Sequence, residues 1–279
     1  MSPSLNIREF RKFVGGFAWP TIALAIATWG VLIAAAYLLQ VEKITPAVMV
    51  LIATACNYLS FTVFHEAAHE NSGICTKVFG WIGCAMFMAP FTATKRIHLT
   101  HHQYTNDPEQ DPDHWVAGHN PILVLLRCLT IYPRYLYTYL FNLKGPSRET
   151  RTNLFVLSIY WILGLAACFT AYAKIAIYGF MIPTFLGTGL TAALFDWIPH
   201  HPHKDQTPLG NTRNIPSKIL NILMLGQNVH GVHHLNPRIP FYRYQRAYFA
   251  ALRSADQQRS QSPKPQGSLD HDLATGLTL

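Results

Sequence analysis

The chain has 279 residues, enough for one large domain or two small ones, and 50% of them are hydrophobic. Only 13% are charged, about half the fraction in an ordinary soluble domain, which argues against a soluble protein and favours a membrane protein. The formal net charge of +8 comes from basic residues that are scattered or flank apolar runs, as membrane topology signals do, so it does not indicate nucleic-acid binding.

The amino-terminal part of the chain predicts a tight membrane hairpin. Residues 1–14 are polar and basic without a cleavage-site pattern, and we expect a cytoplasmic flank there instead of a cleaved signal peptide. The range 14–41 contains no formally charged residue and exceeds the ~20 apolar residues that span hydrocarbon. A second uncharged run, 44–65, begins after only Glu42 and Lys43, so the chain must turn back at once.

Two later apolar segments are predicted not to cross the membrane. The run 78–94 is at the short limit for a span, and a full crossing would separate the histidines before it from those after it. We therefore expect a re-entrant or interfacial segment. The range 121–142 carries Arg127 and Arg134, which are costly at mid-bilayer, and it predicts an interfacial helix.

A second hairpin follows, with spans predicted at 153–173 and 175–195 and a short turn around Lys174. In this arrangement every Lys and Arg except Lys43 and Lys174 lies on one side of the membrane. The positive-inside rule then places the N-terminus, the C-terminus and all histidine motifs on the cytoplasmic side.

The predicted fold is an all-α integral membrane protein with four transmembrane helices in two hairpins, interfacial helices and a cytoplasmic histidine-rich cap. Residues 1–256 form a single membrane-bound domain in this prediction. Residues 257–279 are polar, with Ser, Pro, Gln and Gly prominent, and predict a disordered tail.

Histidines recur at metal-ligand spacing in three places. A pair four residues apart is followed by two H-x-x-H-H motifs, and on a helix such residues lie within one turn, so that two or three imidazoles can converge on one point. A lone histidine on an apolar face is usually a satisfied core residue, but three clustered repeats favour a metal site. The members are His65, His69, His98, His101, His102, His230, His233 and His234.

A ninth candidate follows the fourth predicted span, in the sequence DWIPHHPH. We assign His200 as this ligand, and His201 and His203 either support it or face solvent. Eight or more imidazoles can fill two adjacent metal positions, and neutral imidazole suits iron as well as zinc or copper. Two irons would permit dioxygen activation.

Two other classes of protein share part of this pattern. His65 and Glu66 begin an H-E-x-x-H sequence, the zinc-protease signature, in which the glutamate would be the base. A zinc site needs only three protein ligands, however, and would leave six clustered histidines unexplained. A metal transporter should place ionisable groups inside its spans, whereas these histidines lie beyond the helix ends. Both classes are remote alternatives.

The three histidine motifs and the two hairpins together resemble the membrane fatty-acid desaturase superfamily. Within it, the stretches HLTHHQYTNDPEQDPDHW, DWIPHHPH and SKILNILMLGQNVHGVHHLNPRIPFYRYQRAY are most similar to desaturase-type carotenoid β-ring hydroxylases. Carotenoid ketolases and acyl-lipid desaturases resemble the chain too. One departure is Glu66, where several relatives carry Asp.

This resemblance implies a non-haem di-iron oxygenase that uses O2 and two electrons to hydroxylate a carotenoid β-ring, with the nine histidines holding two iron ions. Fatty-acyl desaturation and carotenoid ketolation are the alternatives within the superfamily. Metal-bound imidazole commonly donates its other N–H to a carboxylate, and Asn228 could orient His230 or cap a helix. The candidates for such supporting roles are Glu66, Asp107, Asp111, Asp113, Asp196 and Asn228.

The source of electrons lies outside the chain in this interpretation. Its five cysteines include no C-x-x-C iron–sulfur pair, and it has no G-x-G-x-x-G nucleotide motif. A separate donor such as ferredoxin is therefore expected. The other expected partners are O2, the lipid bilayer and a hydrophobic lipid substrate, either a carotenoid or a fatty-acyl chain, with no nucleic acid.

Overall fold

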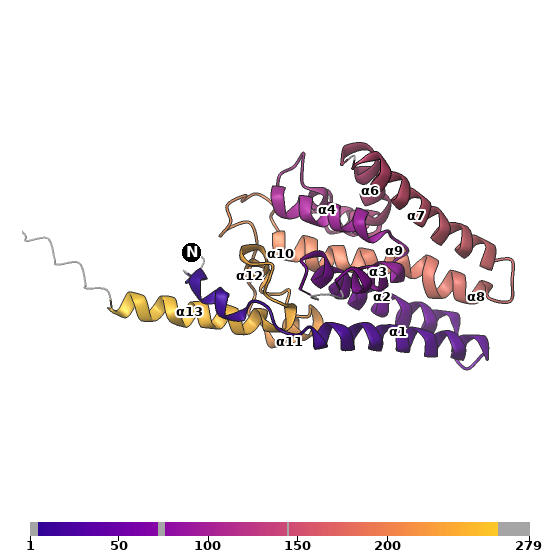
Figure 1. The fold of residues 1–279 in the computed structure, drawn as a ribbon, viewed down its shortest axis with the longest axis horizontal. Helices are drawn as coiled ribbons and strands as arrows, with labels where there is room; N and C mark the ends of the chain where they lie inside the picture. Colours follow the sequence, from indigo (N-terminus) through magenta and orange to yellow (C-terminus); the bar gives the residue numbers. More distant parts are fainter. Residues whose placement is uncertain (1–4, 72–75, 144, 262–279) are drawn as a thin grey trace, which may run out of the picture.

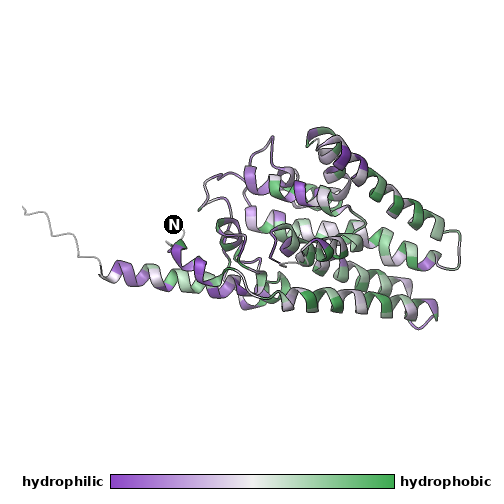
Figure 2. Ribbon diagram, viewed as in Figure 1, coloured by the Kyte–Doolittle hydropathy of each residue, from purple (hydrophilic) through white to green (hydrophobic). Residues whose placement is uncertain are grey.

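Apolar helices dominate the computed structural model, which describes residues 5–71, 76–143 and 145–261 and contains no strand in these ranges (Figure 1). Four helices are long and apolar enough to cross a membrane, which confirms the predicted fold class, and Figure 2 shows how strongly hydrophobic residues dominate them. They are α1 (Trp19–Gln40), α2 (Pro46–Ala68), α7 (Ser147–Ala167) and the continuous helical segment Ala173–His200.

The turns of the two hairpins meet at one end of the molecule (Figure 1). Lys174 Nζ lies 2.9 Å from Glu42 Oε1, and Gln40 Nε2 donates a hydrogen bond to the carbonyl of Ala171 at 3.3 Å. Each contact joins the turn after α1 to the turn after α7. The helix ends that carry the histidines therefore lie together at the opposite end.

The fourth membrane helix is longer than the predicted range 175–195. Pro183 and Pro199 each lack an N–H and would clash with the carbonyl four residues earlier, and in both cases that carbonyl lies in a π-helical turn. At about 42 Å for its 28 residues, the helix extends past a hydrocarbon core of ~30 Å. Its parts are α8 (Ala173–Ile175), η5 (Ala176–Met181), α9 (Ile182–Thr191), η6 (Ala192–Trp197) and α10 (Ile198–His200).

The third membrane helix also differs from its predicted range, 153–173. It ends at Ala167. It begins as early as Ser147, because Glu149 in its first turn is paired with Arg96 and can join the helix. Glu149 accepts hydrogen bonds from the Arg96 guanidinium, the shortest at 2.8 Å. This ion pair fixes the start of α7 against α4 (Phe91–Tyr104).

The segment 78–94, predicted not to cross the membrane, forms the end of one short helix and the start of another. Helix α3 (Thr76–Met86) has 11 residues and is about 16 Å long, too short to span hydrocarbon. Pro90 then precedes α4. The chain thus returns to the end where α2 finishes, and α4 carries its histidines back to those of α2.

The predicted interfacial helix 121–142 is not continuous, and this prediction was wrong in its length. It consists of α5 (Pro121–Leu129), α6 (Ile131–Tyr137) and the π-helical turn η4 (Thr138–Asn142). Pro133 explains the break, since its ring clashes with the carbonyl of Leu129 and it has no N–H to donate. Helix α5 still exposes a row of large aliphatic side chains, at Ile122, Leu123, Leu125 and Leu126.

The remaining helices form a cap over the histidine end. The amino-terminal turn η1 (Ile7–Phe13) packs against the projecting helix α13 (Tyr244–Gln261). Phe10 of η1 and Tyr248 of α13 belong to one buried cluster, and Asn6 N donates a hydrogen bond to the Ala251 carbonyl at 3.2 Å. Helix α13 includes the first residues of the predicted disordered tail, whose remainder, 262–279, lies outside the described residues. The other cap elements are η3 (Pro112–Val116), α11 (Lys218–Leu223), α12 (His230–Leu235) and η7 (Phe241–Arg243).

The contact between the two hairpin turns is testable by cross-linking. With the substitutions Glu42→Cys and Lys174→Cys, a short bis-maleimide should join the two side chains within one molecule, because the native side chains touch at 2.9 Å. Peptide mass spectrometry would identify the link. In the control pair Glu42→Cys and Lys95→Cys, the second cysteine lies at the histidine end, and a link there would contradict the arrangement.

Candidate metal centre

Four helical segments bring the histidines together. His65 lies in the last turn of α2 and His69 caps that helix, while α4 and α12 carry the two H-x-x-H-H motifs and His200 ends α10. Residues four apart share a helix face, whereas the next residue turns by about 100°. The outer two histidines of each H-x-x-H-H motif therefore face one point and the middle one faces another, so two imidazoles per motif converge and not three.

All nine predicted histidines fall into two groups in which the ring nitrogens lie within 4.8 Å of one another. Each H-x-x-H-H motif contributes to both groups. The first group contains His65, His69, His98, His102 and His233. The second contains His101, His200, His230 and His234.

The spacing between rings matches that of imidazoles around a metal ion. Within the first group, Nε2 of His69 lies 2.8 Å from Nε2 of His98, and Nε2 of His65 lies 3.0 Å from Nε2 of His233. Within the second, the corresponding His101–His234 distance is 3.3 Å. Nitrogens bound at about 2.1 Å and at right angles would be about 3.0 Å apart. Both groups thus present the Nε2 atoms that a metal requires.

The environment of the histidines on α4 and α12 favours neutral rings, with the exception of His101. Burial lowers the pKa of His98, His102 and His234 well below 6.5, and neighbouring imidazoles lower it further. The same causes lower the pKa of His230 and His233. Neutral imidazole is the form that binds metals, so no proton must be lost from these rings before an ion enters.

His101 is different because two predicted carboxylates face its other nitrogen. Burial alone would lower the pKa of His101, but Asp111 and Asp113 outweigh burial and raise the pKa to about 10. Their oxygens lie 2.9 Å and 3.2 Å from Nδ1. When a metal occupies Nε2, these carboxylates can hold the Nδ1–H and fix the ring orientation.

Asp196 lies between the two groups. Tyr135 donates a hydrogen bond to Asp113 at 2.6 Å, and its hydroxyl lies 3.1 Å from an Asp196 oxygen. Asp196 also lines a small hollow together with His65, His98, His101 and His230, members of both groups. It is therefore placed at the candidate centre without contacting a ligand nitrogen.

The other predicted supporting residues, Asp107, Asn228 and Glu66, make no hydrogen bond to a ligand. Asp107 accepts hydrogen bonds from the backbone N–H groups of Glu109 and Gln110 and so stabilises its own loop. Asn228 donates to the carbonyls of Ile215 and Ser217, so it neither orients His230 nor caps a helix. Asp107 and Asn228 therefore stabilise the surrounding backbone, because their side chains form hydrogen bonds with main-chain groups.

Glu66 is fully buried and lies beside the ligand His65 without a hydrogen bond to it. Its Oε1 accepts a hydrogen bond from the backbone N–H of Phe241 at 3.1 Å, whereas His65 Nδ1 is 3.9 Å away, too far for a hydrogen bond. A zinc protease would need this carboxylate beside the metal. Its position, and the extra imidazoles around His65 and His69, argue against that alternative.

Sequence reasoning missed two side chains that hold ligands. Gln227 Oε1 lies 2.6 Å from His230 Nδ1, and the Tyr244 hydroxyl lies 3.0 Å from His233 Nδ1. The spacing of Gln227, three residues before His230, was a usable signal. Tyr244 had none, since it comes from α13.

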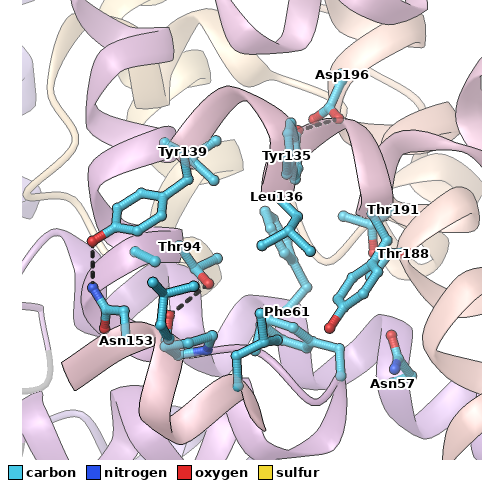
Figure 3. A pocket seen from close by; sticks show the side chains of 18 residues that line it. Asn57, Phe61, Thr94, Tyr135, Leu136, Tyr139, Asn153, Thr188, Thr191 and Asp196 are labelled. Atoms are coloured by element: carbon cyan, nitrogen blue, oxygen red, sulfur yellow. Dashed lines mark hydrogen bonds between the residues drawn. The ribbon is translucent and has the colours of Figure 1, made fainter. Parts of the chain in front are cut away.

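An apolar cavity lies among the membrane helices and α4 and α6 (Figure 3). Leu136, Leu157 and Ile97 contribute to its walls, which come from α2, α4, α6, α7 and α9. Phe61 and Asp196 line both this cavity and the hollow between the histidine groups. The cavity therefore adjoins the hollow between the histidine groups.

Four apolar helices long enough to cross a membrane, together with two imidazole groups at one end of the molecule, define an integral membrane protein of the histidine-box type. Residues 43–261 match the family model described as "Fatty acid desaturase", and the chain belongs to this family. Over 217 residues it is 25% identical to the dihydrorhizobitoxine desaturase of Bradyrhizobium elkanii, covering 67% of this chain and 62% of that protein. The chain thus spans about three fifths of the length of this curated relative.

The role of Gln227 can be tested by metal content. Gln227→Leu removes the acceptor of the His230 Nδ1–H, and loss of such partners typically costs 10–100-fold in metal affinity. We expect a corresponding loss of bound metal, measured by plasma mass spectrometry during titration with a chelator. Asp107→Asn is the matched control and should retain metal. Equal retention in both variants would contradict the assignment.

Proposed function

We propose that this protein is an O2-dependent di-iron oxygenase that hydroxylates a carotenoid β-ring. The observation that carries this proposal is the pair of buried imidazole groups at the end of an apolar cavity. The donor set suits iron, and two irons held there would supply the reduction of O2 and the oxidation of an unactivated C–H bond. The overall reaction consumes a C–H group, O2, two electrons and two protons, and it yields an alcohol and water.

The residues of the chain would hold the metals and position the substrate. One iron would be bound by the group that contains His65 and the other by the group that contains His101. Asp111, Asp113 and Gln227 fix the orientation of ligand rings through their Nδ1 atoms. No side chain is required as a nucleophile.

The cavity favours a hydrocarbon as substrate. Its walls are aliphatic and aromatic, and the charged residue among them, Asp196, lies at the metal end. A long apolar molecule can enter from the bilayer and present one end to the centre. Desaturation of a fatty-acyl chain is a second candidate, supported by the relative that is itself a desaturase.

The electrons and the membrane side are part of the same proposal. Among the described residues, the histidine end carries the basic residues except Lys43 and Lys174, which supports a cytoplasmic location by the positive-inside rule. An external donor such as ferredoxin would deliver electrons there.

Expression in bacteria that accumulate β-carotene tests the function directly. Under 18O2 we expect one or two labelled oxygen atoms in the pigment by mass spectrometry, as hydroxyl groups, and about two irons per purified chain. Unchanged pigment with iron bound and dehydrogenated fatty acyl chains would favour the second candidate. Zinc at one per chain would contradict the di-iron proposal.

Single ligand substitutions test the two groups separately. His233→Ala and His101→Ala each remove a ligand from a different group, and we expect at least a 100-fold loss of turnover with normal membrane insertion. His119→Ala removes an exposed histidine outside both groups and should retain activity. Full activity in either ligand variant would refute the metal assignment.

A further inference from the structure

A second cavity lies on the other face of α6 and η4 from the apolar cavity. The apolar cavity is lined by Tyr135, Leu136 and Tyr139. The second cavity is lined by Arg134, Thr138 and Asn142, which lie four residues apart on the other side of the same helical stretch. We call it the arginine hollow. Its principal polar side chains are Arg127, Arg134, Thr138 and Asn142, and Trp115 lies beside the two arginines.

Trp115 holds the two guanidinium groups in place. Its Nε1 donates to the Arg127 carbonyl at 3.2 Å, and its ring lies 4.9 Å from Arg134 Cζ and 5.8 Å from Arg127 Cζ. Arg134 also lies over Tyr137, and Arg127 donates to the carbonyl of Ala117. Stacked and hydrogen-bonded in this way, both guanidiniums lose little further freedom when they bind a ligand.

The arginine hollow contains both guanidinium and carboxylate groups, which are not paired with each other within the described part of the chain. Neither arginine takes part in an ion pair there, and Arg134 Nε and Thr138 Oγ1 are buried without hydrogen-bond partners. Two carboxylates also line the hollow, Asp111 and Glu109. The oxygens of Asp111 are already engaged by His101 and by backbone N–H groups. Arg134 and Thr138 can therefore donate hydrogen bonds to a ligand in the hollow.

The surroundings of the arginine hollow indicate where such an acceptor comes from. Helix α5, which carries Arg127, exposes Ile122 (69%), Leu125 (59%) and Leu126 (53%). Exposed aliphatic side chains next to half-buried arginines match the acyl chains and the phosphate group of a phospholipid. Basic pockets between membrane helices bind lipid head groups, and the arginine fork fits phosphate with two parallel hydrogen bonds.

We propose that the arginine hollow binds the phosphate group of an anionic phospholipid, with Arg127 and Arg134 as its charged ligands and the acyl chains over α5. Thr138 and Asn142 supply further hydrogen-bonding groups. This site is separate from the metal centre and does not depend on the proposed reaction.

Native mass spectrometry of the purified protein in detergent tests the proposal. Titration with phosphatidylglycerol should show one retained lipid per chain, and phosphatidylcholine should bind at least tenfold more weakly. The double variant Arg127→Gln, Arg134→Gln should lose at least tenfold in affinity for phosphatidylglycerol. Arg148→Gln, which removes an exposed arginine outside the hollow, is the matched control and should bind normally.

A second variant and a competitor make the result decisive. Arg134→Lys keeps the charge but loses the fork and the stacking, so it should bind more weakly than the native protein while keeping its metal content. Displacement of the bound lipid by inorganic phosphate at an equal concentration would assign the site to a soluble phosphate and overturn the lipid proposal. Unchanged lipid retention in the arginine variants, or equal loss in Arg148→Gln, would overturn the proposal.

Discussion

The structure depends on the convergence of buried imidazoles at one end of the membrane helices. Burying a polar ring is costly unless its nitrogens find partners. Here the Nε2 atoms face two common points, and several Nδ1 atoms face fixed acceptors such as Asp111 for His101 and Gln227 for His230. The rings reach these points only when α2, α4, α10 and α12 end close together. The candidate metal site therefore forms only if these four segments pack with their histidine-bearing ends together.

The membrane helices are built to satisfy that constraint. The Lys174–Glu42 contact joins the two hairpin turns at the end of the molecule opposite the histidines. The fourth helix then continues through π-helical turns before Pro183 and Pro199 and brings His200 past the end of an ordinary span. Helix α3 is too short to cross, so α4 stays on the side where α2 ends.

One helical stretch separates two kinds of chemistry. On one face of α6 and η4, Tyr135 and Leu136 close the apolar cavity that leads to the centre. On the other, Arg134 and Thr138 line the arginine hollow. This separation keeps Arg127 and Arg134 away from the lining of the apolar cavity.

The sequence by itself determined the number of spans, the family and the nine histidines, because apolar length and i, i+4 spacing are local properties. Only the tertiary structure decided which histidines of different motifs share a group, since His101 meets His234 from a distant segment. It also decided that Tyr244 supports His233 and that Asp107 supports nothing but its loop. Such pairings depend on how remote segments pack, and local spacing carries no record of them.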